Sequence, residues 1–255
     1  MKLTIRLLRV SLRQAFWGWR FLLASICMAA MFIFPIYRMQ VGIMDGVSAA
    51  IRGTGAEMMI LALLPVIPFG CFYAMEDTGG AIPFWAIRTG TGRYISCKTV
   101  AAILSAMGVF IAGVLLYSVV AFLNGRAFMD GIQADYSYYQ FGCQGQPVIT
   151  LLFYMIHYMF TAGVWTAVGV FVSTCVPNLY VTLAAPSVIY MFIMWFDQYW
   201  PPELAWCNVR NLTAYIYDFP EPGQTLLLHV GVCLAYMVIL TLASVANGKR
   251  RQQNA

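Results

Sequence analysis

The sequence predicts an all-α polytopic membrane protein with six transmembrane helices and an N-terminal amphipathic interfacial helix. Of its 255 residues 61% are hydrophobic and only 10% are charged, and the mean hydropathy is +0.74. A soluble globular domain is nearer half apolar and a quarter charged. The hydrophobic residues also gather in long uncharged runs, and about 20 such residues cross the hydrocarbon core as a helix. This composition excludes a soluble enzyme and a disordered chain.

Residues 1–18 are predicted to form an amphipathic helix at the inner membrane interface. On a helix that turns about 100° per residue, the cations of this region fall on one arc and apolar residues occupy the other faces. These cations are Lys2, Arg6, Arg9, Arg13 and Arg20. Such a helix turns its basic face toward anionic headgroups of membrane lipids. The alternative is an ordinary basic flank that orients the first span.

Six apolar runs follow this segment. The longest uncharged run is divided at Val176-Pro177-Asn178, because proline breaks a helix and asparagine favours a turn. Pro65 and Pro68 are expected to kink the second span. The predicted spans are residues 19–38, 57–75, 99–123, 148–174, 179–196 and 225–246. We interpret residues 1–255 as a single membrane domain, because the segments between spans are too short to fold separately.

The distribution of cations predicts the orientation of the chain. Eleven of the fifteen Lys and Arg residues fall in the N-terminal segment, the loop between the second and third spans, and the C-terminus. Cytoplasmic segments of membrane proteins are enriched in these residues. We therefore expect a multi-pass protein of the cell membrane with both termini in the cytoplasm. No basic patch is interleaved with aromatic residues, so no nucleic-acid partner is expected.

The loop of residues 76–98 has the most distinctive sequence. Two acids close the second span, two glycines follow, and an apolar block from Ile82 to Ile87 precedes a group of cations. An apolar block in a cytosolic loop is costly unless something covers it. The cover is either the inner membrane face or a groove on a partner, with Phe84 or Trp85 as the anchor.

This layout resembles the permease subunits of type-2 ABC exporters. Members of that family have six spans, cytoplasmic termini, an amphipathic N-terminal helix and a loop with an ordered set of residues between spans two and three. The counterparts here are Glu76, Gly80, the block Ile82 to Ile87, Arg88 or Arg93, and Lys98. The end of the fourth span, Gly169 to Ser173, and Asn178 are similar to a small-residue, serine and asparagine run of the family.

The resemblance implies that two permeases, identical or homologous, form a translocation pathway and dock two copies of a separate ATP-binding subunit. Residues 76–98 would form the cytoplasmic coupling loop. Because Pro83 suits a first helical turn, the coupling helix is expected to begin near Ile82. The expected contacts with the ATPase are Glu76, Asp77, Gly80, Phe84, Trp85, Arg88 and Arg93. The sequence has no G-x-x-x-x-G-K-[ST] motif, so ATP hydrolysis is expected on the partner and the chain itself is not expected to be an enzyme or to hold a cofactor.

The outer loops carry fewer signals. The resemblance implies an extracellular re-entrant segment at residues 197–224, and the alternative is an aromatic belt at the outer interface. Cys143 and Cys207 fall in predicted outer loops, where a disulfide persists; the alternative is two free thiols. No Cys or His cluster has the spacing of a metal site.

Two histidines, His157 and His229, fall inside the fourth and sixth spans. An ionisable residue within a span is a functional candidate, so we consider both as pathway-lining residues. The alternative is a histidine that is hydrogen-bonded across helices.

Two other functional classes are alternatives to the exporter. An intramembrane metalloprotease requires H-E-x-x-H, which is absent. A serine protease requires a serine beside a histidine, yet Ser173 is 16 residues from His157 on one predicted helix. A non-transporting accessory or sensor protein is compatible with the sequence. For an exporter, acidic outer loops and abundant aromatic residues favour a hydrophobic or amphipathic substrate, such as a peptide, an antibiotic or a lipid.

Overall fold

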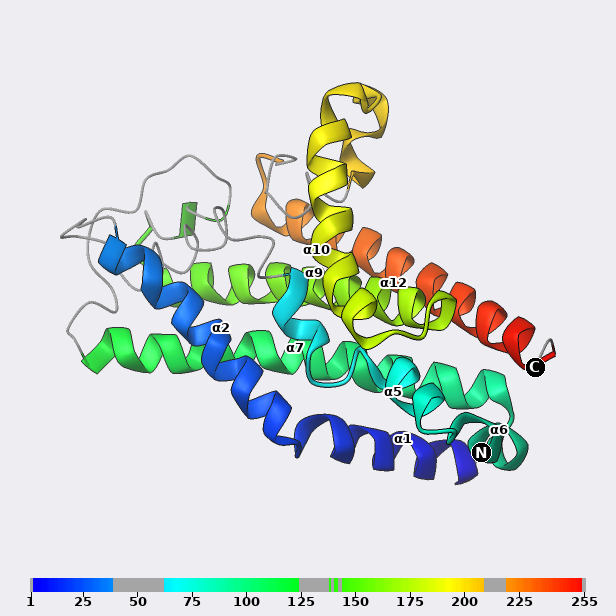
Figure 1. Ribbon diagram of the computed structural model, residues 1–255. Helices are drawn as coiled ribbons and strands as arrows, with labels where there is room; N and C mark the ends of the chain where they lie inside the picture. The colour runs from blue at the N-terminus through cyan, green and yellow to red at the C-terminus, as the bar shows by residue number, and fades with distance from the viewer. Residues whose placement is uncertain are drawn as a thin grey trace.

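The computed structural model describes residues 2–38, 62–123, 138, 140–141, 144–208 and 219–253. Every element in these ranges is a helix (Figure 1). Four helices are long and apolar enough to cross a membrane, and the bent pair α1 and α2 raises the number of candidate spans to five. The all-α class is therefore confirmed, and the helices are consistent with a membrane protein. The number of six spans stays a prediction.

The N-terminal region forms two helices, α1 (Lys2–Phe16) and α2 (Trp19–Arg38), bent by 52° at the break between them. This break coincides with the predicted boundary at residue 18. Leu7, Ser11 and Ala15 recur at a spacing of four, so they share one face of α1, and all three are buried. That face packs on α7, where Ser105 Oγ donates to the carbonyl oxygen of Ala15 at 3.3 Å.

The predicted second span, residues 57–75, is not one continuous helix. Residues 57–61 lie outside the described part of the chain. From residue 62 the chain forms the short 3₁₀ helix η1 (Leu64–Val66), a run of turns, and then α5 (Phe72–Thr78). Pro65 and Pro68 have no backbone N–H to continue an α-helical ladder, which accounts for the interruption.

The predicted coupling loop is mostly helical. The turn after α5 contains Gly80 in the left-handed region, with φ of 65°. Helix α6 (Ile82–Thr89) begins at the expected residue, Ile82. Gly90, with φ of 79°, then separates α6 from α7 (Thr91–Leu123). Helix α7 therefore starts eight residues before the predicted third span, because its polar first turns continue the same helix.

The remaining long helices follow the predicted spans closely. Helix α9 (Pro147–Cys175) opens with a proline at its first position, and α10 (Leu179–Phe196) begins after the predicted break. The Asn178 side chain caps α10 by accepting from the backbone N–H groups of Tyr180 and Val181. Helix α12 (Pro222–Gln253) extends seven residues past the predicted end of the sixth span, residue 246.

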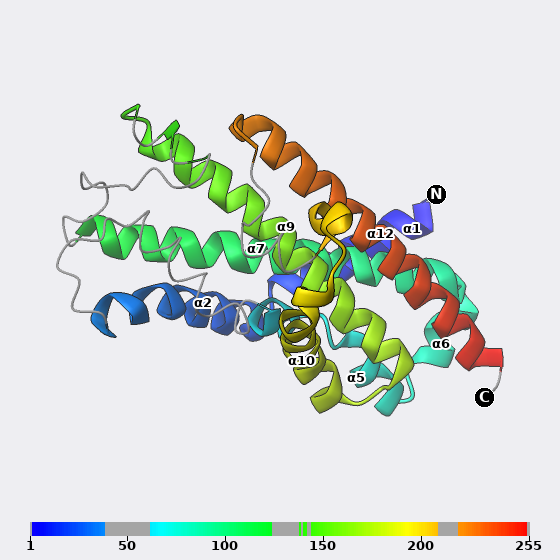
Figure 2. The same cartoon turned by 90° about the horizontal axis from the view of Figure 1, so that it is seen from above.

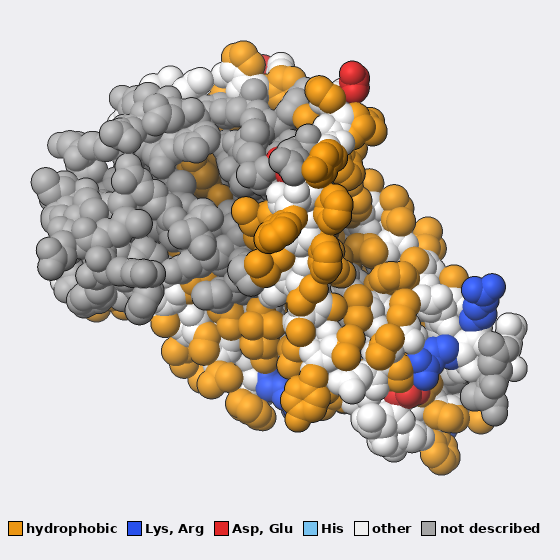
Figure 3. All heavy atoms as spheres, turned by 45° about the horizontal axis from the view of Figure 1, so that its top comes forward, with side chains coloured by type: hydrophobic (Ala, Val, Ile, Leu, Met, Phe, Trp, Pro, Cys, Tyr) orange, Lys and Arg blue, Asp and Glu red, His pale blue; other side chains and the backbone are white. Residues whose placement is uncertain are grey.

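Helices α7 and α9 form the centre of the molecule. Figure 2 shows α2 on one side of α7 and α12 on the far side of α9, and the corresponding pairs are in contact. One buried cluster joins α2, α7, α9 and α10 through residues that include Phe32, Phe110 and Trp165. Helix α10 projects from this body (Figure 1), and much of its apolar surface is exposed. Hydrophobic side chains cover most of the described face in Figure 3, as expected for a protein in contact with lipid.

Candidate functional site

The predicted ATPase-facing segment lies at the end of the molecule that holds both termini. Figures 1 and 2 agree in placing α6, the first residues of α1 and the last residues of α12 toward the same end of the molecule. The beginning of α7 and the end of α12 are joined there by a hydrogen bond from Thr91 Oγ1 to Gln252 Oε1. The helical ends of this region therefore form a common base for α6.

Glu76 and Lys98 form the central ion pair of this base. Lys98 Nζ donates to Glu76 Oε1, and the Lys98 side chain is only 5% exposed. The ammonium also lies 5.1 to 5.6 Å from the ring centres of Phe69, Phe72 and Tyr94. Because a buried ammonium needs a counter-charge and favourable dipoles, this environment holds α5 against α7.

Asp77 connects α5 to the C-terminal helix. Arg251 Nη2 lies 3.5 Å from Asp77 Oδ2, and about a third of each side chain is exposed, so this pair alone contributes little stability. Arg251 also donates to the carbonyl oxygen of Cys175, the last residue of α9, at 3.2 Å. The end of α12 is thus bound to both α5 and α9. We call Glu76, Asp77, Lys98 and Arg251 the ion-pair cluster.

Helix α6 presents an apolar face away from the rest of the chain. Phe84 is 72% exposed and Ile87 is 85% exposed, whereas Ile82 is buried beneath the helix. Trp85 is only 39% exposed because its ring stacks on Tyr94, with centroids 6.5 Å apart. Phe84 is therefore the more accessible of the two predicted anchors, and Trp85 fixes α6 to α7.

The polar residues predicted to face the ATPase divide into two groups. Gly80, Arg88 and Arg93 are exposed beside the apolar face of α6. Glu76 and Asp77 are instead engaged inside the ion-pair cluster. The structure thus brings the predicted residues to one end of the molecule, and their contact with an ATPase stays a prediction.

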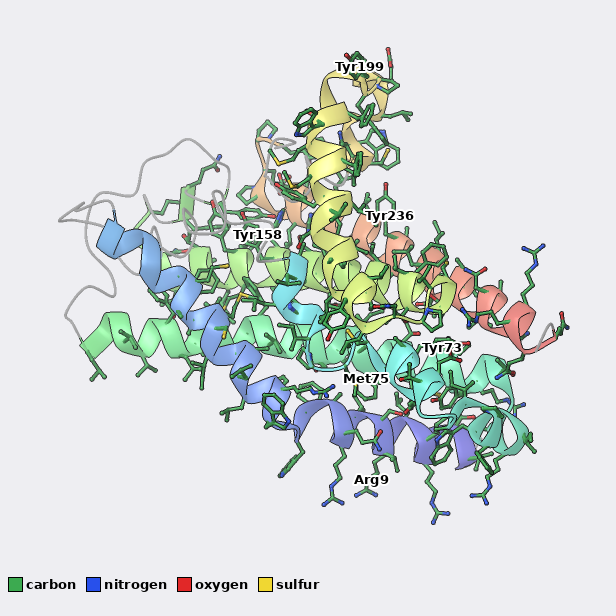
Figure 4. All side chains as sticks on the ribbon, in the orientation of Figure 1. Arg9, Tyr73, Met75, Tyr158, Tyr199 and Tyr236 are labelled. Carbon is green, nitrogen blue, oxygen red and sulfur yellow. The ribbon has the colours of Figure 1, made fainter. Side chains whose placement is uncertain are left out.

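Helix α1 carries its predicted cations on the outer side. Arg6, Arg9 and Arg13 are exposed, and Arg9 points away from the other helices (Figure 4). The side chain of Lys2 lies outside the described part of the structure. The amphipathic character of α1 agrees with the prediction, and its position at the membrane interface stays a prediction.

His157 and His229 lie together between α9 and α12. Both are buried, and their rings stack with centroids 3.5 Å apart. Nε2 of His229 lies 2.8 Å from the carbonyl oxygen of His157, and since a carbonyl only accepts, this nitrogen carries the hydrogen. Thr161 Oγ1 also donates to that oxygen at 3.3 Å. The cross-helix hydrogen bond is therefore observed, and a role in lining a pathway stays a prediction.

The predicted outer segment, residues 197–224, is described at its two ends. It contains the 3₁₀ helices η2 (Asp197–Tyr199) and η3 (Pro202–Cys207), and Tyr236 of α12 binds it by donating to the carbonyl oxygen of Cys207 at 2.7 Å. Residues 209–218 lie outside the described ranges. Cys143 does too, so the Cys143–Cys207 disulfide stays a prediction, and no re-entrant path is assigned.

Two contributors to this site were not identified from the sequence as partners. From the sequence, Arg251 indicates only which side of the membrane the C-terminus occupies. Tyr94 has no predicted role. Their partners are Asp77 and Trp85, respectively. Asp77 and Arg251 are 174 positions apart in the sequence, so no local signal could pair them. In comparisons with known proteins, the chain matches no family model, no curated sequence and no solved structure.

Proposed function

We propose that this chain is the membrane-spanning subunit of an ATP-driven ABC exporter. Its substrate is hydrophobic or amphipathic: a peptide, an antibiotic or a lipid. Two permease chains, identical or homologous, form the pathway, and each docks one ATPase subunit through α6. Both termini lie in the cytoplasm, and α1 lies at the inner membrane interface. The observation that carries the proposal is the geometry of α6, a short helix with an exposed apolar face on a base fixed by ion pairs.

The composition of α6 and its link to α7 favour a protein groove over the membrane as its cover. Along the chain, the exposed Phe84 and Ile87 fall between the exposed Gly80 and the exposed cations Arg88 and Arg93. An aromatic anchor surrounded by polar and charged residues is the usual composition of an interface centre and rim. The helix is also joined to α7 through a single residue, Gly90. A force applied to α6 would therefore act directly on a predicted span.

The test is recovery of the partner from native membranes. The chain is tagged at its C-terminus, extracted gently, and its co-purifying proteins are identified by mass spectrometry. We expect a P-loop ATPase in stoichiometric amount, together with the second permease if the dimer is heteromeric. Recovery of the chain alone, even after crosslinking in intact cells, would favour a non-transporting accessory protein.

A variant pair makes this test specific to α6. Phe84→Ala removes the exposed anchor, and we expect ATPase recovery to fall about 30-fold, which corresponds to about 2 kcal/mol of binding free energy. Tyr199→Ala removes an equally exposed aromatic residue at the tip of the segment after α10 (Figure 4) and should leave recovery unchanged. Equal recovery from both variants would place the docking surface elsewhere.

A further inference from the structure

A cavity of about 320 Å³ lies where the bend between α1 and α2 faces the broken second span. Gly18, Trp19 and Arg20 line one side, and Phe69, Phe72 and Met75 line the other. Figure 4 shows Met75 between α5 and α1. The lining from the second span and α5 is thus mainly apolar, with Glu76 as its one carboxylate, and a guanidinium lies at the bend.

Among the residues that the structure describes, no carboxylate forms an ion pair with the guanidinium of Arg20. Its described side-chain hydrogen bond goes from Nη1 to the uncharged Sδ of Met75, at 2.9 Å. Within the described ranges, the ion pairs are those of Glu76 with Lys98 and of Asp77 with Arg251. Glu76 also lines the cavity, but its charge is matched by Lys98. A cation beside an apolar cavity attracts an anionic group that brings apolar surface with it.

The surroundings place this cavity at the level of lipid headgroups. Trp17 and Trp19 are 85% and 70% exposed at the bend, and tryptophan is enriched at membrane–water interfaces. On one side of the bend α1 exposes Arg6, Arg9 and Arg13, and on the other side α2 is apolar and long. A change from basic to apolar surface at exposed tryptophans is what a headgroup layer requires.

We propose that this cavity binds one anionic phospholipid. Arg20 receives the phosphate through charge-assisted hydrogen bonds, and the amide of Gln14, which also lines the cavity, supplies a further donor. One acyl chain lies against Phe69 and Phe72. The bound lipid holds the bend between α1 and α2 in place. This proposal requires only that the chain resides in a membrane, so it does not depend on ATPase docking.

Native mass spectrometry of the full chain in detergent tests the proposal with three ligands. Phosphatidylglycerol has the phosphate, the net charge and the acyl chains, phosphatidylcholine lacks the net charge, and glycerol phosphate lacks the chains. We expect one phosphatidylglycerol to remain bound and the other two ligands to bind about tenfold more weakly or not at all. Equal binding of phosphatidylcholine would refute selection for an anionic lipid, and equal binding of glycerol phosphate would indicate a soluble phosphate ligand instead.

Two variants distinguish lipid binding in the cavity from a general attraction of anionic lipid to the basic surface of α1. Arg20→Gln should reduce phosphatidylglycerol retention about tenfold, because it removes the cavity cation. Arg9→Gln removes the same charge from the exposed side of α1 and should reduce retention less than about twofold. Equal losses in both variants would mean that lipid binds diffusely to the basic surface, and the cavity proposal would be wrong.

A second variant covers the case in which Arg20→Gln does not fold. Gly18→Leu adds bulk at the edge of the cavity without changing charge, and a Cβ there meets only the carbonyl oxygen of Gln14 at 3.4 Å and the amide nitrogen of Arg20 at 4.0 Å. We expect lower phosphatidylglycerol retention with unchanged helical content by circular dichroism. Full retention would contradict the cavity as the binding site. Recovery of the ATPase is scored separately, so the two proposals succeed or fail independently.

Discussion

Lys98 is the residue whose environment most clearly determines local stability at the α6 end. Its ammonium is buried, paired with Glu76 and surrounded by three aromatic rings. A buried pair adds little net stability over an apolar replacement, but removal of one partner leaves a buried charge without compensation. The effect of a substitution therefore depends on whether the other charge is removed as well.

Lys98→Met should destabilise the protein by about 2 kcal/mol or more, because the carboxylate of Glu76 loses its counter-charge. For a chain of this size that corresponds to a melting temperature lower by about 4–8 °C, measured in detergent by scanning fluorimetry. The double variant Glu76→Gln with Lys98→Met should recover at least half of the loss.

Arg93→Met is the matched control, because it removes an exposed cation from the same helix and should change stability by less than about 0.5 kcal/mol. If the Lys98→Met and Arg93→Met variants have the same melting temperature, the ion pair does not stabilise the fold.

At the residue scale the sequence predicted types and positions better than pairings. Glu76, Asp77 and Lys98 were recognised because charges that bound apolar runs stand out. The pairing of Asp77 with Arg251 arises only when α12 folds back beside α5, and no local pattern encodes that proximity. The sequence also did not predict the stacking of Trp85 on Tyr94. Both residues lie in the predicted coupling loop, residues 76–98, where no regular spacing relates one side chain to another.

At the scale of single elements, glycines on α7 allow the N-terminal helices to pack closely. A Cβ built on Gly113 lies 2.5 Å from Met28 Cγ and 2.7 Å from Met28 Cβ, and one built on Gly108 lies 2.6 Å from Phe16. Small residues at such positions let helix backbones approach, which is the main source of helix association in a membrane. Any side chain at Gly113 therefore separates α2 from α7.

Gly113→Ala should destabilise the protein by about 1–3 kcal/mol, because the added methyl overpacks against Met28. Gly231→Ala on α12 provides the comparison, since a Cβ there meets no atom within 4 Å. That variant should be neutral or gain up to about 1 kcal/mol from helix propensity. Thermal unfolding of both variants in the same detergent is the measurement, and equal stability would show that α2 and α7 tolerate a wider spacing.

Element boundaries followed the sequence where local chemistry set them. The C-terminal end of α9 and the start of α10 were predicted to within one residue because Pro177 and Asn178 determine them locally. The start of α7 and the end of α12 were misplaced, since hydropathy marks where a helix enters lipid and not where it begins. The interruption of the second span exceeded the predicted kink, because two prolines three residues apart remove successive helical hydrogen bonds.

At the scale of the whole molecule, the chain termini and α6 lie together at one end of the long helices α7 and α12. Helix α10 projects sideways from the middle of the molecule, and Tyr199 lies at the tip of this projection, away from the termini (Figures 1 and 4). The orientation relative to the membrane stays a prediction.

Epitope tags at two open turns test that orientation. Gly80 and Gly145 have φ of 65° and 76°, and a Cβ at either position meets no atom of the described residues within 4 Å, so we choose both turns for an insertion. A tag after Gly145 should bind antibody on intact cells, whereas a tag after Gly80 should bind only after permeabilisation. A C-terminal tag should behave like the Gly80 tag. Labelling of the Gly80 tag on intact cells would invert the topology.

The single-residue link between α6 and α7 has a mechanical consequence. Helix α7 has 33 residues and is therefore a rod about 50 Å long. Tilting such a rod by about 10° carries its far end roughly 9 Å sideways. Only Gly90 separates α6 from α7, and α7 runs from that point through the centre of the molecule. If α6 and α7 rotated as one body, a small displacement at α6 would therefore move the far end of α7 by several ångströms.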